Sequence, residues 1–237
     1  MATKPAPFDK DEVVVKNRLR PKDAATLVLV RREKNSLRVL MGQRHGNMAF
    51  MANKFVFPGG RVDPGDQRIL IGGNLPSHAT ERLTKDASAQ RARGFALAAI
   101  RETFEEAGIL IGEHAEKLPR TRAPAWRKFF EHGVVPRLDG LDFIARAITP
   151  PNRTRRFDAR FFMADADAIA HTLDTRENEE LLTPAWLTFA EARALDLPSI
   201  TRAVLDEVEA RIGDGKDGIR PVPFFRFRRG ETMIDYL

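Results

Sequence analysis

The chain has 237 residues, of which 43% are hydrophobic, and it carries a formal net charge of +6 with a pI near 9.9. This length and apolar content suit one α/β domain with additions rather than two independent domains. The absence of cysteine excludes disulfides and thiol catalysis and is typical of a reducing compartment. The basic residues are scattered, so the charge suits phosphorylated small molecules or nucleic acid without choosing between them.

The N-terminal lead-in, residues 1–23, is polar and has no apolar core of the kind that a signal peptide needs. No run in the sequence approaches the roughly 18 apolar residues of a membrane span. We therefore expect a soluble, cytoplasmic protein that has no membrane partner.

Three strands and a glycine loop are predicted next. β-branched and apolar residues fill Ala24–Arg32 and Leu37–Arg44, with a polar link between them. The stretch "KFVFPGG" (54–60) predicts a third short strand, and its Pro-Gly-Gly ending predicts a loop whose backbone can approach a ligand. Residues 66–87 show no steady period and are typical of a loop.

A helix follows, and its apolar face is set by Leu97, Ile100, Phe104 and Ala107, at spacings of three, four and three. Gly108 is placed to cap its C-terminal end.

The remaining elements do not alternate in a regular βαβ order. Helices are expected at 124–133, 189–195 and 199–213, and strands at 141–150, 155–164 and 181–188. The mixture predicts an α/β fold in which a mixed sheet packs between helices. Residues 24–212 would form this domain, the last helices would close the ordered part, and 213–237 would be a C-terminal tail.

The predicted helix ends in "IRETFEEAGI", where Glu102, Glu105 and Glu106 share one face at i, i+3 and i+4. Carboxylates at the negative end of a helix each cost roughly 0.3–1 kcal/mol. A solvated acidic face is one interpretation. The position at the helix end, the opposed apolar face and the preceding glycine loop favour a bound cation instead. Oxygen ligands of this kind indicate Mg²⁺ or Mn²⁺.

The same residues resemble the second half of the Nudix box, G-x5-E-x7-R-E-U-x-E-E-x-G-U, in which U is aliphatic. Thr103 stands at the first aliphatic position, and the matching residues are Arg101, Glu102, Glu105, Glu106, Gly108 and Ile109. Gly60 matches the opening glycine, and Asp66 stands where the pattern has glutamate. Gly60 and Arg101 are 41 positions apart, against 14 in the contiguous box, so 27 extra residues interrupt the motif.

The interruption resembles a Nudix subgroup that includes the peroxisomal coenzyme A diphosphatases of animals and their bacterial relatives. The resemblance covers about Ala24 to Phe189 and includes "VFPGGRVDPGD", "ALAAIRETFEEAGIL", "ITP" and "RRFDARFF". It implies the Nudix fold, with an insertion inside the box and added C-terminal helices. It also implies metal-dependent hydrolysis of a nucleoside diphosphate conjugate, with coenzyme A or acyl-CoA as the preferred substrate. We expect the insertion, residues 67–87, to be a surface excursion beside the active site that affects substrate choice.

The resemblance also implies roles for the box residues. Glu105 and Glu106 would be the principal metal ligands, and Glu102 would be a further ligand or the base for the attacking water. The carbonyl of Gly59 would add an oxygen, and Arg101 would orient the glutamates by ion pairing.

Two candidate groups lie beyond the box. Many family members place an additional catalytic glutamate there, and the candidates are Glu177, Glu179 and Glu180, of which we favour Glu180. Arginine forks suit phosphate oxygens, so the cluster of Arg153, Arg155 and Arg156 predicts substrate binding, with surface solvation or an ion pair to Asp158 as alternatives.

Other functions stay open at this level. The substrate could be ADP-ribose, a dinucleotide or a capped RNA, or the chain could be a non-catalytic Nudix module that binds a nucleotide. The intact glutamate set favours an enzyme. The stretch "FFRFRRG" (224–230) comes closest to a basic run interleaved with aromatic residues, but it is short, so a nucleic-acid partner is not expected. A homodimer is compatible with the sequence. Trp126 and Trp186 lie in apolar patterns and are assigned to packing.

Overall fold

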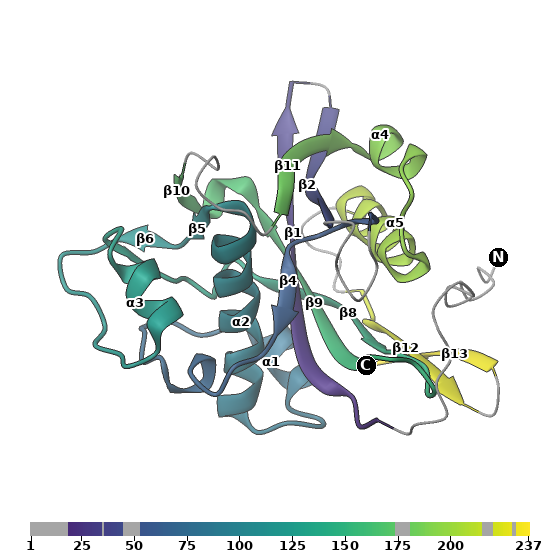
Figure 1. Ribbon diagram of the computed structural model, residues 1–237, viewed down its shortest axis with the longest axis horizontal. Helices are drawn as coiled ribbons and strands as arrows, with labels where there is room; N and C mark the ends of the chain where they lie inside the picture. The colour runs from purple at the N-terminus through teal and green to yellow at the C-terminus, as the bar shows by residue number, and fades with distance from the viewer. Residues whose placement is uncertain (1–18, 35, 45–52, 174–180, 215–219, 229–230) are drawn as a thin grey trace.

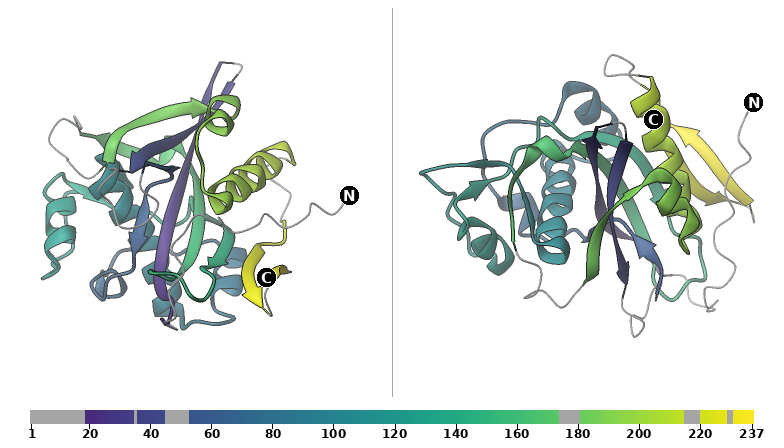
Figure 2. Two further views of the ribbon diagram at one scale, coloured as in Figure 1. Left: turned by 45° about the vertical axis from the view of Figure 1, so that its right-hand side comes forward. Right: turned by 90° about the horizontal axis from the view of Figure 1, so that it is seen from above.

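The computed structural model describes residues 19–34, 36–44, 53–173, 181–214, 220–228 and 231–237. Their elements form a central sheet with helices on both faces (Figure 1). Helices α2 and α3 lie on one side of the sheet, and α4 and α5 lie on the other (Figure 2). The predicted sandwich is confirmed.

The central sheet has nine strands in the order β11-β2-β1-β9-β8-β12-β13, with β3 paired to β2 and β4 paired to β1. The strands are β1 (Lys22–Glu33), β2 (Ser36–Arg44), β3 (Phe55–Val56), β4 (Gly59–Arg61), β8 (Asp142–Ile148), β9 (Phe157–Asp165), β11 (Leu181–Thr188), β12 (Pro223–Arg228) and β13 (Glu231–Tyr236). β1 runs parallel to β9 and β12 parallel to β8, and the other pairs are antiparallel. The sheet is therefore mixed, as the sequence predicts.

The remaining elements surround this sheet. Two short pairs are β5 (Ile109–Ile111) with β10 (Ile169–Thr172) and β6 (Glu113–His114) with β7 (Val134–Val135). The helices are η1 (Asp66–Arg68), α1 (Ser77–Leu83), α2 (Ala89–Ala107), α3 (Pro124–Phe130), η2 (Ala166–Ala168), α4 (Phe189–Ala194) and α5 (Ser199–Gly213). Among the described residues, no helix is long and apolar enough to cross a membrane.

β1 lies inside the sheet and is buried on both faces. Leu27 and Leu29 join the core that α2 covers, whereas Val28 and Val30 join the core that α5 covers. Successive side chains of a strand point to opposite faces, so a strand buried on both sides has a continuous apolar sequence. Burial on both faces therefore explains the continuous apolar stretch from which the strand at Ala24–Arg32 was predicted.

α2 begins and ends at recognisable caps. The Ser88 hydroxyl accepts a hydrogen bond of 3.2 Å from the N–H of Arg91. At the other end Gly108 adopts φ +65°, and its N–H donates to the carbonyl of Phe104 at 2.9 Å. The predicted glycine cap is confirmed, and the helix places the acidic motif on its last two turns.

The insertion is part of the core rather than a surface excursion. Ile69, Leu75, Ala79 and Leu83 are at most 8% exposed and pack in the cluster that contains α2. The prediction was wrong because Ile69 and Leu75 lie in an irregular link and Ala79 and Leu83 in a short helix, which together give no periodic signal.

The C-terminal stretch is also structured. β12 and β13 form a hairpin that extends the sheet, with Phe224 and Phe225 paired to Arg146 and Ala147 of β8. Val222, just before the hairpin, is fully buried. The expectation that helices close the ordered part, leaving 213–237 as a tail, was wrong, because the strand partner lies far away in the sequence.

Candidate active site

The glycine loop brings backbone against α2. β4 pairs with β1 so that Gly59 faces Thr26. A Cβ on Gly60 would lie 2.5 Å from Oε2 of Glu102, and a Cβ on Gly59 would lie 2.7 Å from Cα of Thr26. A side chain at position 59 would therefore clash with backbone, whereas one at position 60 would displace the Glu102 carboxylate, which the close approach seats on the loop.

Arg101 links the two halves of the motif through every N–H of its guanidinium group. Nε donates to Oδ1 of Asp66 at 2.8 Å, and Nη2 donates to Oδ2 of Asp66 at 3.0 Å and to the carbonyl of Arg61 at 2.8 Å. Nη1 donates to Oε1 of Glu102 at 2.9 Å and to Oε2 of Glu105 at 2.6 Å. Burial lowers the pKa of Arg101, but the hydrogen bond to Asp66 and the adjacent carboxylates raise it above its ordinary value. All five donors are satisfied, so the guanidinium group has one orientation.

Asp66 occupies the place of the box glutamate and is fully buried. Besides the two bonds from Arg101, its Oδ1 accepts from Nε1 of Trp126 at 2.8 Å and its Oδ2 accepts from the N–H of Asp63 at 2.8 Å. The shorter acid thus reaches Arg101 in spite of the interruption. Trp126, which the sequence assigned to packing, is also a hydrogen-bond donor.

The three glutamates of the motif face different surroundings. Glu102 and Glu106 line one cavity, and Oε2 of Glu106 accepts a 2.8 Å bond from the N–H of Gly59. Glu105 pairs with Arg101 and does not line this cavity. Burial raises the pKa of Glu102 to about 7, although the pairing with Arg101 opposes the rise.

This donor set fits a divalent cation that binds together with a substrate. In the described part of the chain, no three carboxylate or imidazole groups are gathered closely enough to cage a metal ion by themselves. Mg²⁺ in nucleotide-processing sites is usually held by one or two carboxylates plus substrate phosphates. Two carboxylates on one cavity wall match this mode of binding.

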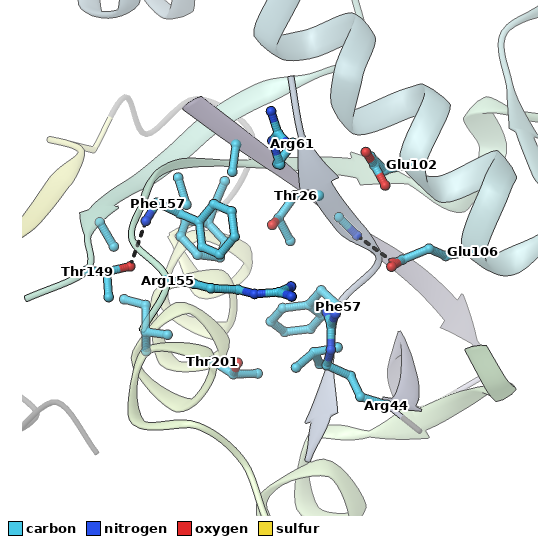
Figure 3. A pocket seen from close by; sticks show the side chains of 18 of the residues that line it. Thr26, Arg44, Phe57, Arg61, Glu102, Glu106, Thr149, Arg155, Phe157 and Thr201 are labelled. Carbon is cyan, nitrogen blue, oxygen red and sulfur yellow. Dashed lines mark hydrogen bonds between the residues drawn. The ribbon is translucent and has the colours of Figure 1, made fainter. Parts of the chain in front are cut away.

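The cavity has a volume of about 390 Å³ and lies between the glutamates of α2, the glycine loop and the start of α5 (Figure 3). Its lining includes the side chains of Arg44, Arg61 and Arg155 and the rings of Phe57 and Phe157. In Figure 3 the Arg155 side chain extends across the cavity toward Phe57. Anionic groups and a planar base are the chemistry that such a lining accommodates.

The cavity arginines carry charge that the described residues do not neutralise. Within the described ranges, neither the Arg44 nor the Arg155 guanidinium group has a hydrogen-bond or ion-pair partner. Nε of Arg44 is enclosed and still lacks a partner among these residues. Guanidinium groups in this state are suited to phosphate oxygens.

The three arginines of the predicted cluster lie in different surroundings. Arg155 lines the cavity, whereas Arg153 is buried outside its lining. Arg156 donates through Nε to the carbonyl of Thr149 at 3.0 Å and through Nη1 to the carbonyl of Leu19 at 2.6 Å. Two of the three predicted substrate contacts are therefore placed away from the cavity.

Two other sequence expectations concern acidic residues. Glu177, Glu179 and Glu180 lie outside the described residues, so the role of Glu180 stays a prediction. Asp158 pairs with Arg146 at 2.9 Å and with Arg160 at 3.1 Å. Among the cavity residues that the sequence analysis did not single out is Arg44, which ends β2 and carried no motif of its own.

Comparison with known proteins finds the same similarity to Nudix hydrolases that the sequence motif indicates. No family model matches the chain. The acyl-coenzyme A diphosphatase NUDT19 of Gallus gallus is 27% identical to this chain, over 65% of this chain and 54% of the relative, so the chain spans about half of that protein. A solved structure, that of a NUDIX hydrolase from Alicyclobacillus acidocaldarius, matches with a TM-score of 0.62 and 26% identity, covering 81% of this chain and 92% of that one. The Nudix fold and the resemblance to coenzyme A diphosphatases are confirmed.

Proposed function

We propose that the chain is a Mg²⁺- or Mn²⁺-dependent diphosphatase that hydrolyses the diphosphate of a nucleoside diphosphate conjugate, with coenzyme A or an acyl derivative as substrate. The observation that carries this proposal is one cavity that combines Glu102 and Glu106 with guanidinium groups lacking partners among the described residues (Figure 3). The Nudix fold and the similarity to a protein named as an acyl-coenzyme A diphosphatase support it.

The chemistry follows from the charges of the substrate. Diphosphate oxygens are negative and repel a nucleophile, and a bound divalent cation supplies charge neutralisation and a water of lowered pKa. Glu102 and Glu106 would hold the cation, with the carbonyl of Gly59 as a further oxygen donor. Glu105 is the third proposed ligand, and its Oε2 accepts a hydrogen bond from Arg101. Arg101 keeps the carboxylates oriented, so the protein supplies positioning and needs no covalent nucleophile.

The rest of the cavity suits a substrate that has a phosphate beyond its diphosphate. Coenzyme A carries such a group at the 3' position, whereas dephospho-coenzyme A and ADP-ribose do not. Arg155 and Arg44 offer planar forks for its oxygens, and the ring of Phe57 offers a face for the adenine. These lining groups support the proposal of coenzyme A as the substrate class.

The proposed hydrolytic activity is tested by incubating the protein with diphosphate conjugates and Mg²⁺ or Mn²⁺ and identifying the products by mass. Glu106→Gln should lower turnover at least about a hundredfold, a barrier increase of roughly 2.7 kcal/mol, because it removes charge from the metal site. Glu116→Gln is the matched control, since Glu116 is exposed and lies outside the cavity lining. Near-normal activity of Glu106→Gln would refute the assignment of Glu106 as a metal ligand.

The substrate part is tested by comparing kcat/KM for coenzyme A, dephospho-coenzyme A and ADP-ribose. If Arg155 binds the 3'-phosphate, Arg155→Ala should weaken use of coenzyme A by roughly 1.5–3 kcal/mol, the range for hydrogen bonds to charged groups. Arg137→Ala, which removes an exposed guanidinium outside the cavity lining, is the control. Equal efficiency of the parent on coenzyme A and its dephospho form would reject the contact, and faster cleavage of ADP-ribose would identify an ADP-ribose hydrolase.

A further inference from the structure

The shorter acid of the interrupted box is held by groups from outside the motif. Asp66 begins the single turn η1, where its N–H donates to the carbonyl of Asp63 at 3.0 Å. The turn fits closely between two helices: a Cβ on Gly65 would lie 2.9 Å from Cβ of Ala123, directly before α3, and a Cβ on Gly94 of α2 would lie 2.5 Å from Cγ of Gln67. The backbone that carries Asp66 is therefore fixed by contacts with α2 and α3.

Trp126 of α3 contributes the side-chain part of this support. It is fully buried, and its ring packs against Phe129 and Phe130 with centroids 5.2 and 5.7 Å apart. Phe129 in turn packs edge-on against Phe104 of α2 at 5.3 Å. These rings fix the indole, so its N–H points at Oδ1 of Asp66 in one direction only.

We infer that Trp126 is a positioning residue for the active site. Its N–H holds the Asp66 carboxylate, Asp66 holds the fork of Arg101, and the remaining N–H groups of Arg101 hold Glu102 at the cavity. Each link is a hydrogen bond of 2.8 to 2.9 Å between groups that are largely withdrawn from solvent. Outer partners of metal-binding carboxylates set the orientation of the ligand, and their loss typically costs 10–100-fold in metal affinity or activity, about the range we expect here.

The first test is Trp126→Phe in the full chain, which keeps an aromatic ring and removes the N–H. This test rests on the proposed function, because it follows metal-dependent turnover. We expect the Mn²⁺ concentration for half-maximal activity to rise about tenfold or more, with kcat falling and the substrate KM changing less. Phe130→Leu is the control, since it disturbs the same ring cluster but removes no hydrogen bond to Asp66.

Two outcomes of this test would overturn the inference. In the first, Trp126→Phe has the metal requirement and kcat of the parent and only a lower melting temperature. In the second, Phe130→Leu raises the metal requirement as much as Trp126→Phe does, which would assign the effect to packing.

A second measurement needs no turnover, so it separates this inference from the proposed function. The chain has two tryptophans, Trp126 and Trp186, and labelling them with ¹⁵N gives two indole N–H signals, of which the one missing in Trp126→Phe belongs to Trp126. Addition of Mg²⁺ should shift the Trp126 signal, through Asp66 and Arg101, and leave that of Trp186 in place. If Mg²⁺ binds and the Trp126 signal does not move, the coupling is absent. If Mg²⁺ does not bind and none of the diphosphate conjugates is hydrolysed, the proposed function fails instead.

Discussion

The insertion should be essential to folding, although it interrupts a catalytic motif. Replacement of residues 67–87 by a short Gly/Ser link removes Ile69, Leu75 and Leu83 from the core that α2 covers. Full burial of such a side chain stabilises a protein by about 1.5–3 kcal/mol, so the three together are worth roughly 5–9 kcal/mol. Native proteins have a net stability of about 5–15 kcal/mol. We therefore expect the replaced chain to lose cooperative folding.

Polar contacts of the segment add to this expectation. Asp86 pairs with Arg146 of β8, and Nε2 of His78 lies 3.0 Å from Oδ1 of Asp142 on the same strand. A shorter link gains only a small amount of closure entropy, about 0.6 kcal/mol for each halving of loop length. This gain cannot offset the loss of buried surface.

Two point variants, one at a buried and one at an exposed position of the insertion, test the same expectation. Leu83→Ala, at a position that is 5% exposed, should destabilise the protein by about 2–5 kcal/mol. Leu70→Ala, at a position in the same segment that is 85% exposed, should change stability by less than about 0.5 kcal/mol. Urea unfolding followed by circular dichroism measures both. Equal midpoints for the two variants, or parent-like melting of the replaced chain, would refute the core assignment.

Three further changes test other parts of the structure. Gly60→Ala should leave a folded protein with at least about tenfold lower turnover, because its Cβ would displace the Glu102 carboxylate; parent-like kcat would contradict this. Mg²⁺ at ten times its dissociation constant should stabilise the parent by about 1.4 kcal/mol in thermal melts, and the shift should shrink in Glu106→Gln; an equal shift in both would place the ion elsewhere. Deletion of 222–237 removes the buried Phe225 and its neighbours and should cost at least about 3 kcal/mol in urea unfolding, whereas an unchanged midpoint would make the hairpin dispensable.

Elements with a regular apolar pattern could be predicted from the sequence, and those without one could not. The face of α2 repeats with the period of a helix, and Ala24–Arg32 is a continuous β-branched and apolar run, so local sequence indicates both elements. The core residues of the insertion follow no period, and β12 depends on β8, a distant partner in the sequence. Burial of these parts is decided by tertiary contacts, which a single sequence does not display.

Some residues of the candidate active site could likewise be predicted from the sequence, and others could not. The glutamates could be found because their spacing on one helix predicts a common face, and Arg101 because it matches the motif that the sequence resembles. Arg44 and Arg155 meet at the cavity because β2 and the turn before β9 converge there. The sequence offered Arg155 only together with Arg153 and Arg156, and it gave no reason to single out Arg44. The indole donor of Trp126 depends on how α3 packs, which apolar spacing does not reveal.

Hydrogen bonds from within the protein compensate the acidic end of α2. Each carboxylate at a helix C-terminus costs roughly 0.3–1 kcal/mol through the dipole, and three on one face also repel each other. Arg101 donates to Glu102 and Glu105, and a backbone N–H of β4 donates to Glu106. The same guanidinium group also neutralises the buried Asp66, so one positive charge serves three carboxylates and the cluster remains negative. Because the geometry is set by hydrogen bonds within the protein while negative charge remains, a divalent cation can bind without rearranging the fold, and we expect the metal to control turnover rather than folding.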